Sequence, residues 1–470
     1  MTEPGQRDPL ARILEFGLIV VVLAAPLPFA AVGPRGRLGL ELAAGLLGLL
    51  WIVRSRSHGT ADLGLSTRIG IAGLMLVASL QIVPIGRTVV SVLSPAAIEL
   101  REATALPAEA LQAELALIGA DPTTLDASPT LSLDPAASAS ALRTGAAMLL
   151  LFLVAATVAA TCGGARLTLA LLVSASFQSL YGLLVLTSGH DQIWHRAKRA
   201  YLDAATGTFV NKNHFACFLA MSAACGLALI LRNSRRRPRA TRPGLAAFLG
   251  SEGSRNLILG LLLVVVMAGL LASFSRAGIV LGLAALLLTL LLAGRSPALR
   301  TRVTVAALIL AVAAVPLFRI GPDRLIERYA GSKQSLVEPG GRGQVWLDSL
   351  RMTAVYPVSG TGFGTFSAAY PLHRSPEVRL FYAHAHNDLI QVLVEGGVLG
   401  MIPLLLLLIP LARSLLLGLA GTKGTIAVGI AAAVVAVMLH GLIDFNFHIP
   451  ANAATAAILA GALMGLPCRS

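Results

Sequence analysis

The residues best suited to proton transfer form one short cluster, Tyr382–Asp388, which runs directly into an apolar segment beginning at Leu389. An imidazole has an unperturbed pKa of about 6.5, so His384 or His386 can accept a proton near neutral pH. A His-x-His pair also suits a metal ion, but a third ligand of compatible geometry is not evident, so we expect no metal.

The residues that follow this cluster predict a helix with one polar stripe. Asp388, Gln391 and Glu395 recur at helical spacing within an otherwise apolar sequence. Polar side chains are costly in contact with lipid, so we expect this stripe to face protein or water.

Two arginines stand where an anion can reach them. Arg276, in Ser273–Gly278, lies in a very short hairpin between two apolar stretches, where a guanidinium needs an anion or a carboxylate, or else extends to the interface. Arg342 follows Gly340 and Gly341 in a turn that leads into a helix; it can approach a diphosphate, or it is an exposed loop charge. The glycines of Gly360–Gly364 lack a nucleotide-loop context and predict turns.

Two further polar groups have open interpretations. In Gly207–Phe215, the residues Asn211, Lys212 and Asn213 at a helix start can bind a phosphate or a sugar, or can form an Asn cap beside a lysine that extends to the interface. The last group can line a sugar site or simply cap a hairpin, and it comprises His440, Asp444, Asn446 and His448.

The elements that must position these residues are apolar blocks. The chain is 56% hydrophobic and 13% charged, with a mean hydropathy of +0.78, and blocks of about 20 apolar residues recur along it. We therefore predict an all-α membrane protein with one polytopic domain over residues 1–470. The predicted spans are approximately 13–32, 37–53, 69–85, 144–162, 167–187, 213–231, 256–274, 277–294, 303–319, 389–412, 425–443 and 450–466.

Basic residues in short loops set the expected orientation. They lie at Arg54, Arg56 and Arg68, between Arg232 and Arg242, and between Arg295 and Arg302. Because Lys and Arg near the ends of spans tend to stay on the cytoplasmic side, we expect both termini on that side. Segments 86–140, 188–212 and 320–388 then fall outside, with the last a partly helical catalytic loop between the ninth and tenth spans. The formal net charge of +14 fits this topology and anionic lipid, whereas nucleic acid is not expected as a partner.

Taken together, these motifs resemble the bacterial O-antigen ligase and O-antigen polymerase superfamily. The resemblance spans roughly 140–465 and is most specific over about 339–400. It rests on residues 207–215, 275–278, 342–346 and 386–397, on the order of these motifs, and on their expected location on the same side of the membrane.

The resemblance implies an inverting membrane glycosyltransferase without a cofactor. Such enzymes move a glycan from undecaprenyl diphosphate to an acceptor hydroxyl on lipid A-core or on a growing polysaccharide. The chain would act in lipopolysaccharide or exopolysaccharide biosynthesis, in the inner membrane with a periplasmic active site. Arg276 and Arg342 match the arginines that bind the diphosphate, and His386, followed by Asn387, matches the proposed base. His384 is an additional imidazole whose role the pattern leaves open.

The chain departs from a generic ligase in Lys212, in the long segment 86–140 and in the group at 440–448. These features leave open a polymerase that uses the same donor. From another class, a transporter of lipid-linked oligosaccharide would bind with the same arginines and leave the glycosyl diphosphate intact.

Overall fold

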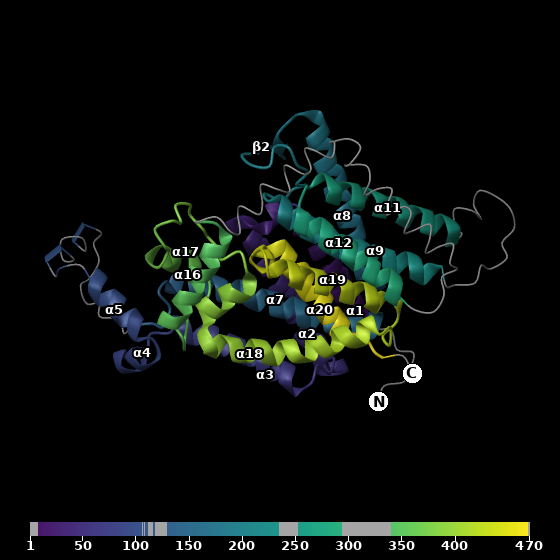
Figure 1. Ribbon diagram of the computed structural model, residues 1–470. Helices are drawn as coiled ribbons and strands as arrows, with labels where there is room; N and C mark the ends of the chain where they lie inside the picture. Colours follow the sequence, from purple (N-terminus) through teal and green to yellow (C-terminus); the bar gives the residue numbers. More distant parts are fainter. Residues whose placement is uncertain are drawn as a thin grey trace. The chain divides into compact units, whose positions relative to one another are not determined.

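The computed structural model describes residues 8–105, 107, 109–110, 116–117, 129–234, 252–293 and 340–468. Within these ranges the chain forms fifteen α-helices, short 3-10 turns and one small hairpin (Figure 1). Strand β1 (Gln192–Ile193) pairs antiparallel with β2 (Arg196–Ala197), with Gln192 opposite Ala197. Apart from this hairpin, the prediction of a helical protein is confirmed.

In the described part of the chain, seven helices are long and apolar enough to cross a membrane, which makes the chain a multi-pass membrane protein. They are α2 (Pro34–His58), α3 (Leu65–Ile82), α7 (Pro135–Cys162), α8 (Ala165–Ser188), α9 (Lys212–Asn233), α11 (Glu252–Ala272) and α18 (Asp388–Leu419). Three shorter apolar helices are α12 (Arg276–Leu292), α19 (Thr425–Gly441) and α20 (Pro450–Gly465).

These ten helices correspond to ten of the predicted spans. The prediction of a span over 13–32 is wrong in its boundaries, because α1 covers Pro9–Ala24. Pro26 and Pro28 follow, and a proline lacks the N–H that would continue the helix, so turns and the 3-10 helix η1 (Phe29–Ala31) take its place. The predicted span 303–319 lies outside the described residues.

Short helices occupy the predicted outer segments. Helices α4 (Arg87–Leu93) and α5 (Pro95–Thr104) lie within 86–140. The end of the predicted loop 320–388 contains α16 (Arg342–Val355), α17 (Phe366–Ala369) and η3 (Tyr370–Leu372), and η4 (Asn446–His448) joins α19 to α20. The expectation of a partly helical loop before the tenth span is confirmed for residues 340–388.

The chain forms two compact units. The first comprises Met1–Gly64, Ala147–Tyr329 and Ile409–Ser470. Its central helix is α9, whose apolar span is entirely buried against α8, α11, α12 and α19. Small residues allow this close packing, since Gly278 and Gly282 of α12 lie against alanines of α9, and Gly429 of α19 does the same.

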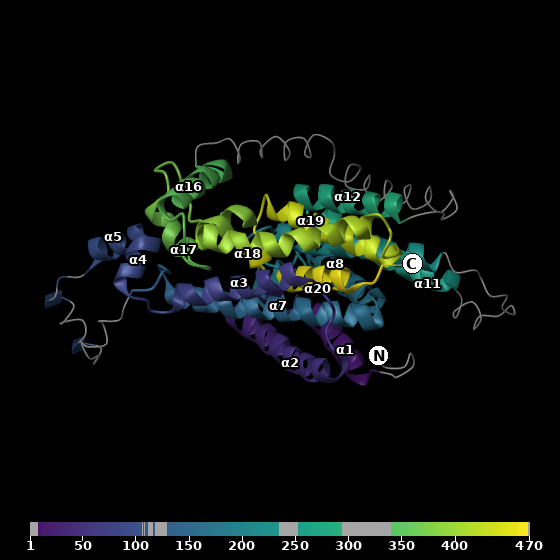
Figure 2. The ribbon, with the colours of Figure 1, turned by 90° about the horizontal axis from the view of Figure 1, so that it is seen from below.

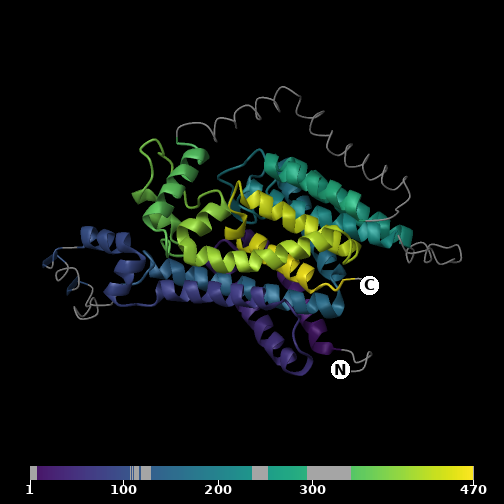
Figure 3. The ribbon, with the colours of Figure 1, turned by 60° about the horizontal axis from the view of Figure 1, so that its bottom comes forward.

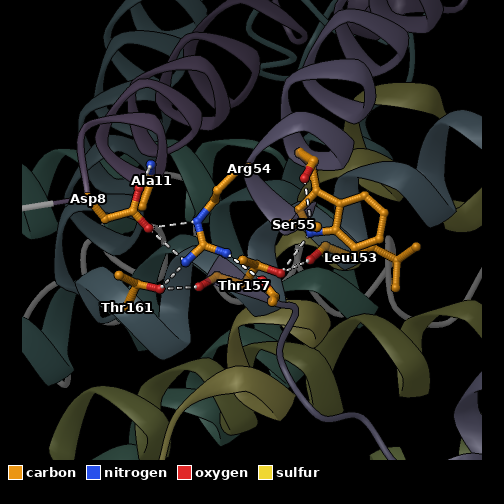
Figure 4. Close-up of polar contacts among 9 residues, drawn as sticks. Asp8, Ala11, Arg54, Ser55, Leu153, Thr157 and Thr161 are labelled. Atoms are coloured by element: carbon orange, nitrogen blue, oxygen red, sulfur yellow. Dashed lines mark hydrogen bonds and ion pairs between the residues drawn. The ribbon is translucent and has the colours of Figure 1, made fainter. Parts of the chain in front are cut away.

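The first unit also contains a buried ion pair between the start of α1 and the end of α2, which run side by side (Figures 2 and 3). The guanidinium of Arg54 donates to Asp8 at 2.8 Å, to the carbonyl of Gly59 at 2.9 Å and to Thr161 at 3.2 Å (Figure 4). Arg54, which the sequence presents as an orienting charge, is therefore also a structural residue.

The second unit comprises Leu65–Ala146 and Ala330–Leu408. Its main feature is a break in α18 at Gly397, where φ is +59° and ψ is −160°. A side chain at this position would clash with the backbone of Val358 and Gly360. Helix α3 runs alongside α18 (Figures 1 and 2), and Gly70 and Gly73 of α3 contact Pro403 of α18.

Residues 357–366, here the turn segment, satisfy the backbone groups that the break exposes. The amides of Val398 and Leu399 donate to the carbonyls of Pro357 and Val358 at 2.9 and 3.0 Å. In return, the amides of Thr361 and Gly362 donate to Val394 and Glu395, each at 3.0 Å. An irregular backbone within a membrane helix needs such internal hydrogen-bond partners, so the break in α18 and the turn segment stabilise each other.

Candidate active site

The predicted site residues divide between the two units. Asn211, Lys212, Asn213 and Arg276 belong to the first unit, whereas Arg342, His384, His386 and Asn387 belong to the second. Each group has its own geometry, and each is built from the contacts within its unit.

In the second unit, His386 lies in a strained loop immediately before α18. Its φ is +53°, in the left-handed region, which costs a residue other than glycine about 1–3 kcal/mol. Asn387 caps the helix, because its Oδ1 accepts from the amides of Leu389 and Ile390, each at 3.1 Å. A helix cap on one side therefore helps to hold the strained histidine in place.

Tyr382 connects the His386 loop to the start of α16. Its ring meets the His386 ring edge-on, with centroids 5.7 Å apart, and its hydroxyl donates to the carbonyl of Gly340 at 3.5 Å. Arg342 is the first residue of α16, as the turn-to-helix prediction required, and is partly exposed. One tyrosine thus spans the two chain segments that supply the predicted arginine and the predicted base.

The predicted polar stripe on α18 is confirmed, since Asp388, Gln391 and Glu395 are all buried. Gln391 accepts from the amide of Ala385 at 3.1 Å, and its Nε2 lies 3.2 Å from His384 Nδ1 and 3.0 Å from Glu395 Oε1. The stripe therefore faces protein and reaches back to the two residues before His386.

Two buried side chains from apolar helices hold the turn segment. Glu395 accepts from the amides of Gly364 at 2.9 Å and Phe366 at 3.1 Å. Gln81 of α3 donates to the carbonyls of Ser359 and Glu395, and accepts from the amide of Phe363 at 2.9 Å. The interpretation of residues 360–364 as turns is confirmed. The role of Gln81 was not predictable from the sequence, because its partners lie far along the chain.

Asp348 organises the segment between α16 and the His386 loop. Its fully buried carboxylate accepts from Gln344, Tyr370, Arg351 and twice from Ser375, at 2.6–3.2 Å. Burial alone would raise the pKa of this carboxyl, but the hydrogen bonds from Ser375, Gln344 and Tyr370 outweigh it and lower the pKa. The sequence does not indicate this organising role of Asp348, because it is a single acidic residue on a short helix.

In the first unit, the start of α9 presents a lysine. Asn211 is the N-cap, with Oδ1 accepting from the amide of Asn213 at 2.8 Å, so the capping interpretation is confirmed for this residue. The ammonium of Lys212 lies 5.6 Å from the centre of the Tyr201 ring, and its charge also acts on that of Arg276. Lys212 and Arg276 therefore form a local concentration of positive charge.

Arg276 begins α12 immediately after the short hairpin that follows α11. Ser275 caps the helix by accepting from the amide of Gly278 at 3.3 Å, and the Arg276 side chain is exposed. The predicted short connection between two apolar helices is confirmed, and it leaves the guanidinium at a helix end.

The group at 440–448, which the sequence left open, contacts the start of α9. Asp444 accepts from Asn213 Nδ2 at 2.9 Å and lies 3.7 Å from His214 Nε2, while Phe445 meets the His214 ring at 4.6 Å. Asn452 of α20 donates to the carbonyl of His214 at 3.0 Å. This buried network fixes the two residues that follow Lys212.

Within the described ranges, no three His, Cys, Asp or Glu side chains gather as they would around a metal ion.

Comparison with known families gives one match. Residues 258–405 match the family model described as O-antigen ligase. The resemblance drawn from the sequence is therefore confirmed for this stretch, which contains Arg276, Arg342 and the His386 loop. Residues 211–213 and 440–448 fall outside the match. A comparison with curated proteins found no match.

Proposed function

We propose, from the membership of residues 258–405 in the O-antigen ligase family of membrane glycosyltransferases, that this chain transfers a glycan from undecaprenyl diphosphate to an acceptor hydroxyl. The reaction takes place at the periplasmic face of the inner membrane. The observation that carries the proposal is the contact of Tyr382 with both His386 and Gly340, because it joins the base and Arg342 in one unit.

The step is a single displacement with inversion. The acceptor oxygen attacks the anomeric carbon of the glycan, the bond from that carbon to the diphosphate oxygen breaks, and His386 takes the proton from the acceptor hydroxyl. Undecaprenyl diphosphate leaves with the electron pair. A hydroxyl is a poor nucleophile, so a positioned imidazole that removes its proton accelerates attack by about 10²–10⁴-fold.

Positive charge stabilises the leaving group. In this proposal each unit supplies its own group for binding phosphate, Arg342 in the second unit and Arg276 with Lys212 in the first, and the negative charge of the diphosphate grows as the bond breaks. The mutual repulsion of Lys212 and Arg276 supports this role, since a bound anion relieves it. This charge arrangement does not require a metal ion.

The asparagines act next to these groups. Asn211 caps α9, Asn213 binds Asp444, and Asn387 caps α18. We propose that they serve the substrate by holding Lys212 and His386 in position.

Lipid A-core is the proposed acceptor, and a growing polysaccharide is the alternative within the same family. Both acceptors present a hydroxyl to the same donor, so a ligase and a polymerase of this family differ only in the acceptor molecule that they use.

Purified protein in liposomes provides the test. Undecaprenyl-diphosphate glycan is supplied with lipid A-core or with a second lipid-linked repeat unit, and the product mass identifies the acceptor. We expect His386→Ala to abolish transfer, whereas His190→Ala, a change to an exposed histidine in the first unit, should leave it intact. Full transfer by His386→Ala would remove the proposed base. Movement of an intact glycosyl diphosphate across the bilayer, without transfer, would indicate a transporter instead.

A further inference from the structure

We propose that the β1–β2 hairpin and the adjoining face of α8 anchor the first unit to the membrane surface. In this proposal Phe177, Tyr181 and Trp194, here the aromatic anchor, lie where the lipid headgroups meet the acyl chains, and Arg196 and Arg199 bind lipid phosphates. All of these residues belong to the first unit. The proposal does not depend on the proposed glycosyl transfer, because it concerns the lipid around the protein.

The three rings of the aromatic anchor form one continuous surface. The centroid of the Tyr181 ring lies 4.9 Å from that of Trp194 and 6.2 Å from that of Phe177, and the rings of Phe177 and Trp194 are 6.4 Å apart. Phe177 is 44% exposed and Trp194 is 41% exposed. Exposed apolar surface of this kind marks a contact with a membrane or with another molecule.

Both N–H groups of Trp194 are bonded within the protein. The backbone N–H donates to the Tyr181 hydroxyl at 2.6 Å, and the indole Nε1–H donates to the carbonyl of Leu27 at 2.8 Å. The indole can therefore enter an apolar environment without leaving a donor unpaired. The bond to Leu27 also fixes the ring on the connection between α1 and η1.

The backbone of Trp194 is strained. Trp194 and His195 form the two-residue loop of the hairpin, and Trp194 has a φ of +55°. A positive φ at the first position of such a loop favours glycine, yet this chain has a tryptophan there. Because strain of this kind persists mainly where it serves a function, the conformation indicates that the exposed indole contacts a partner.

The exposed face of α8 favours lipid as that partner. Its large apolar residues recur at helical spacing and are 41–59% exposed, namely Leu169, Val173, Phe177, Leu180 and Leu184. Helix α8 is long and apolar enough to cross a membrane, so this stripe faces acyl chains. The aromatic anchor continues the stripe, and Tyr181 lies about 10 Å before the helix end at Ser188. Tryptophan and tyrosine concentrate at this level of a membrane.

The charge of the hairpin also fits phospholipid. Residues 190–199 carry three Arg or Lys side chains and one Asp. Arg196 and Arg199 are exposed, and the guanidinium of Arg196 lies 5.3 Å from the centre of the Phe29 ring. Basic side chains next to a surface that faces acyl chains are placed to bind phosphates, which lie just outside the hydrocarbon.

Fluorescence quenching in liposomes tests the aromatic anchor. The chain has three tryptophans, so the double variant Trp51→Phe with Trp346→Phe keeps only Trp194. We expect strong quenching by phospholipid brominated near the headgroup end of its acyl chains, weaker quenching by lipid brominated near the chain ends, and little by aqueous iodide. If the double variant does not fold, the quenching that the wild-type protein loses on Trp194→Phe gives the same comparison.

Two results would overturn the position of the aromatic anchor. Quenching by iodide, with none by either brominated lipid, would place the rings in water, where a sugar ring is the remaining partner. Strongest quenching by bromine near the chain ends would place them in the centre of the bilayer.

The arginines have a separate readout. At equal mole fraction, brominated phosphatidylglycerol should quench Trp194 more than brominated phosphatidylcholine, with a local enrichment of about fivefold for each arginine. Arg196→Gln with Arg199→Gln should remove this enrichment, whereas Arg255→Gln, a change to an exposed arginine of α11, should keep it. Equal quenching by the two lipids before any arginine is changed would overturn the proposed binding of lipid phosphates.

Discussion

The ring of Tyr382 meets the imidazole of His386 edge-on, with the two planes at 85° and the centroids 5.7 Å apart. The same tyrosine packs against Tyr370, whose hydroxyl donates to Asp348 at 3.2 Å. A chain of ring contacts and hydrogen bonds therefore links the strained His386 loop to the buried carboxylate of α16.

This relationship predicts that the ring of Tyr382 matters more than its hydroxyl. An edge-to-face pair contributes about 0.5–1.5 kcal/mol, so Tyr382→Ala should lower kcat/KM for transfer by roughly threefold to tenfold. Tyr382→Phe keeps the ring and loses only the long hydrogen bond to Gly340, so it should stay close to wild type. Transfer assays in liposomes measure both, and equal loss in the two variants would place the effect in the hydroxyl.

Asp348 should make stability depend on pH. Its pKa is lowered in the folded protein from an ordinary value of 3.8, so its contribution is present above that value and is lost as the pH falls through the folded pKa. Asp348→Asn should lower the melting temperature near neutral pH, with a loss of about 3 kcal/mol in unfolding free energy. Below pH 3.8 the stability of this variant should fall less steeply with pH than that of the wild type.

The exposed Asp191 provides the control for that experiment, since Asp191→Asn should keep both the melting temperature and the acid decline. An unchanged acid decline in Asp348→Asn would assign the pH dependence to other groups. Transfer should also fall in Asp348→Asn, because Arg342 begins the helix that this carboxylate anchors.

The break in α18 should tolerate no side chain at Gly397. Alanine there would be strained at φ +59° and would meet the backbone of Val358 and Gly360, so Gly397→Ala should reduce the yield of folded protein. Gly260 of α11 has open space around it, and Gly260→Ala should be neutral or slightly stabilising, by about 0.5–1 kcal/mol. Elution as a single species after extraction in detergent measures both. A well-folded Gly397→Ala protein would show that the break can straighten.

Removing one partner of the Asp8–Arg54 ion pair (Figure 4) should lower the stability of the protein more than replacing both partners. Arg54→Ala leaves the half-buried carboxylate of Asp8 without its partner, which should cost less than the roughly 3–5 kcal/mol lost when a fully buried pair is broken. The double variant Asp8→Asn with Arg54→Met should recover much of the loss, because no uncompensated charge remains. Arg56, exposed on the same helix, is the control. Melting temperatures that fall equally for Arg54→Ala and Arg56→Ala would show that the pair contributes little.

Hydropathy predicted the helices well because membrane spans are specified locally. A run of about 20 apolar residues must form a helix in lipid, whatever surrounds it. The starts of α9, α12, α16 and α18 were also predictable, since Asn211, Ser275, Gly341 and Asn387 precede them and the asparagines and serine accept from the first free amides.

The sequence by itself determined the membrane class, the order of the motifs and the family of residues 258–405, because each depends on neighbouring residues along the chain. Only the tertiary structure decided which polar groups meet. Gln81 binds Phe363 across 282 positions, and Asn213 binds Asp444 across 231. These contacts could not be predicted from the sequence, because each donor and its acceptor come from distant segments that only folding brings together.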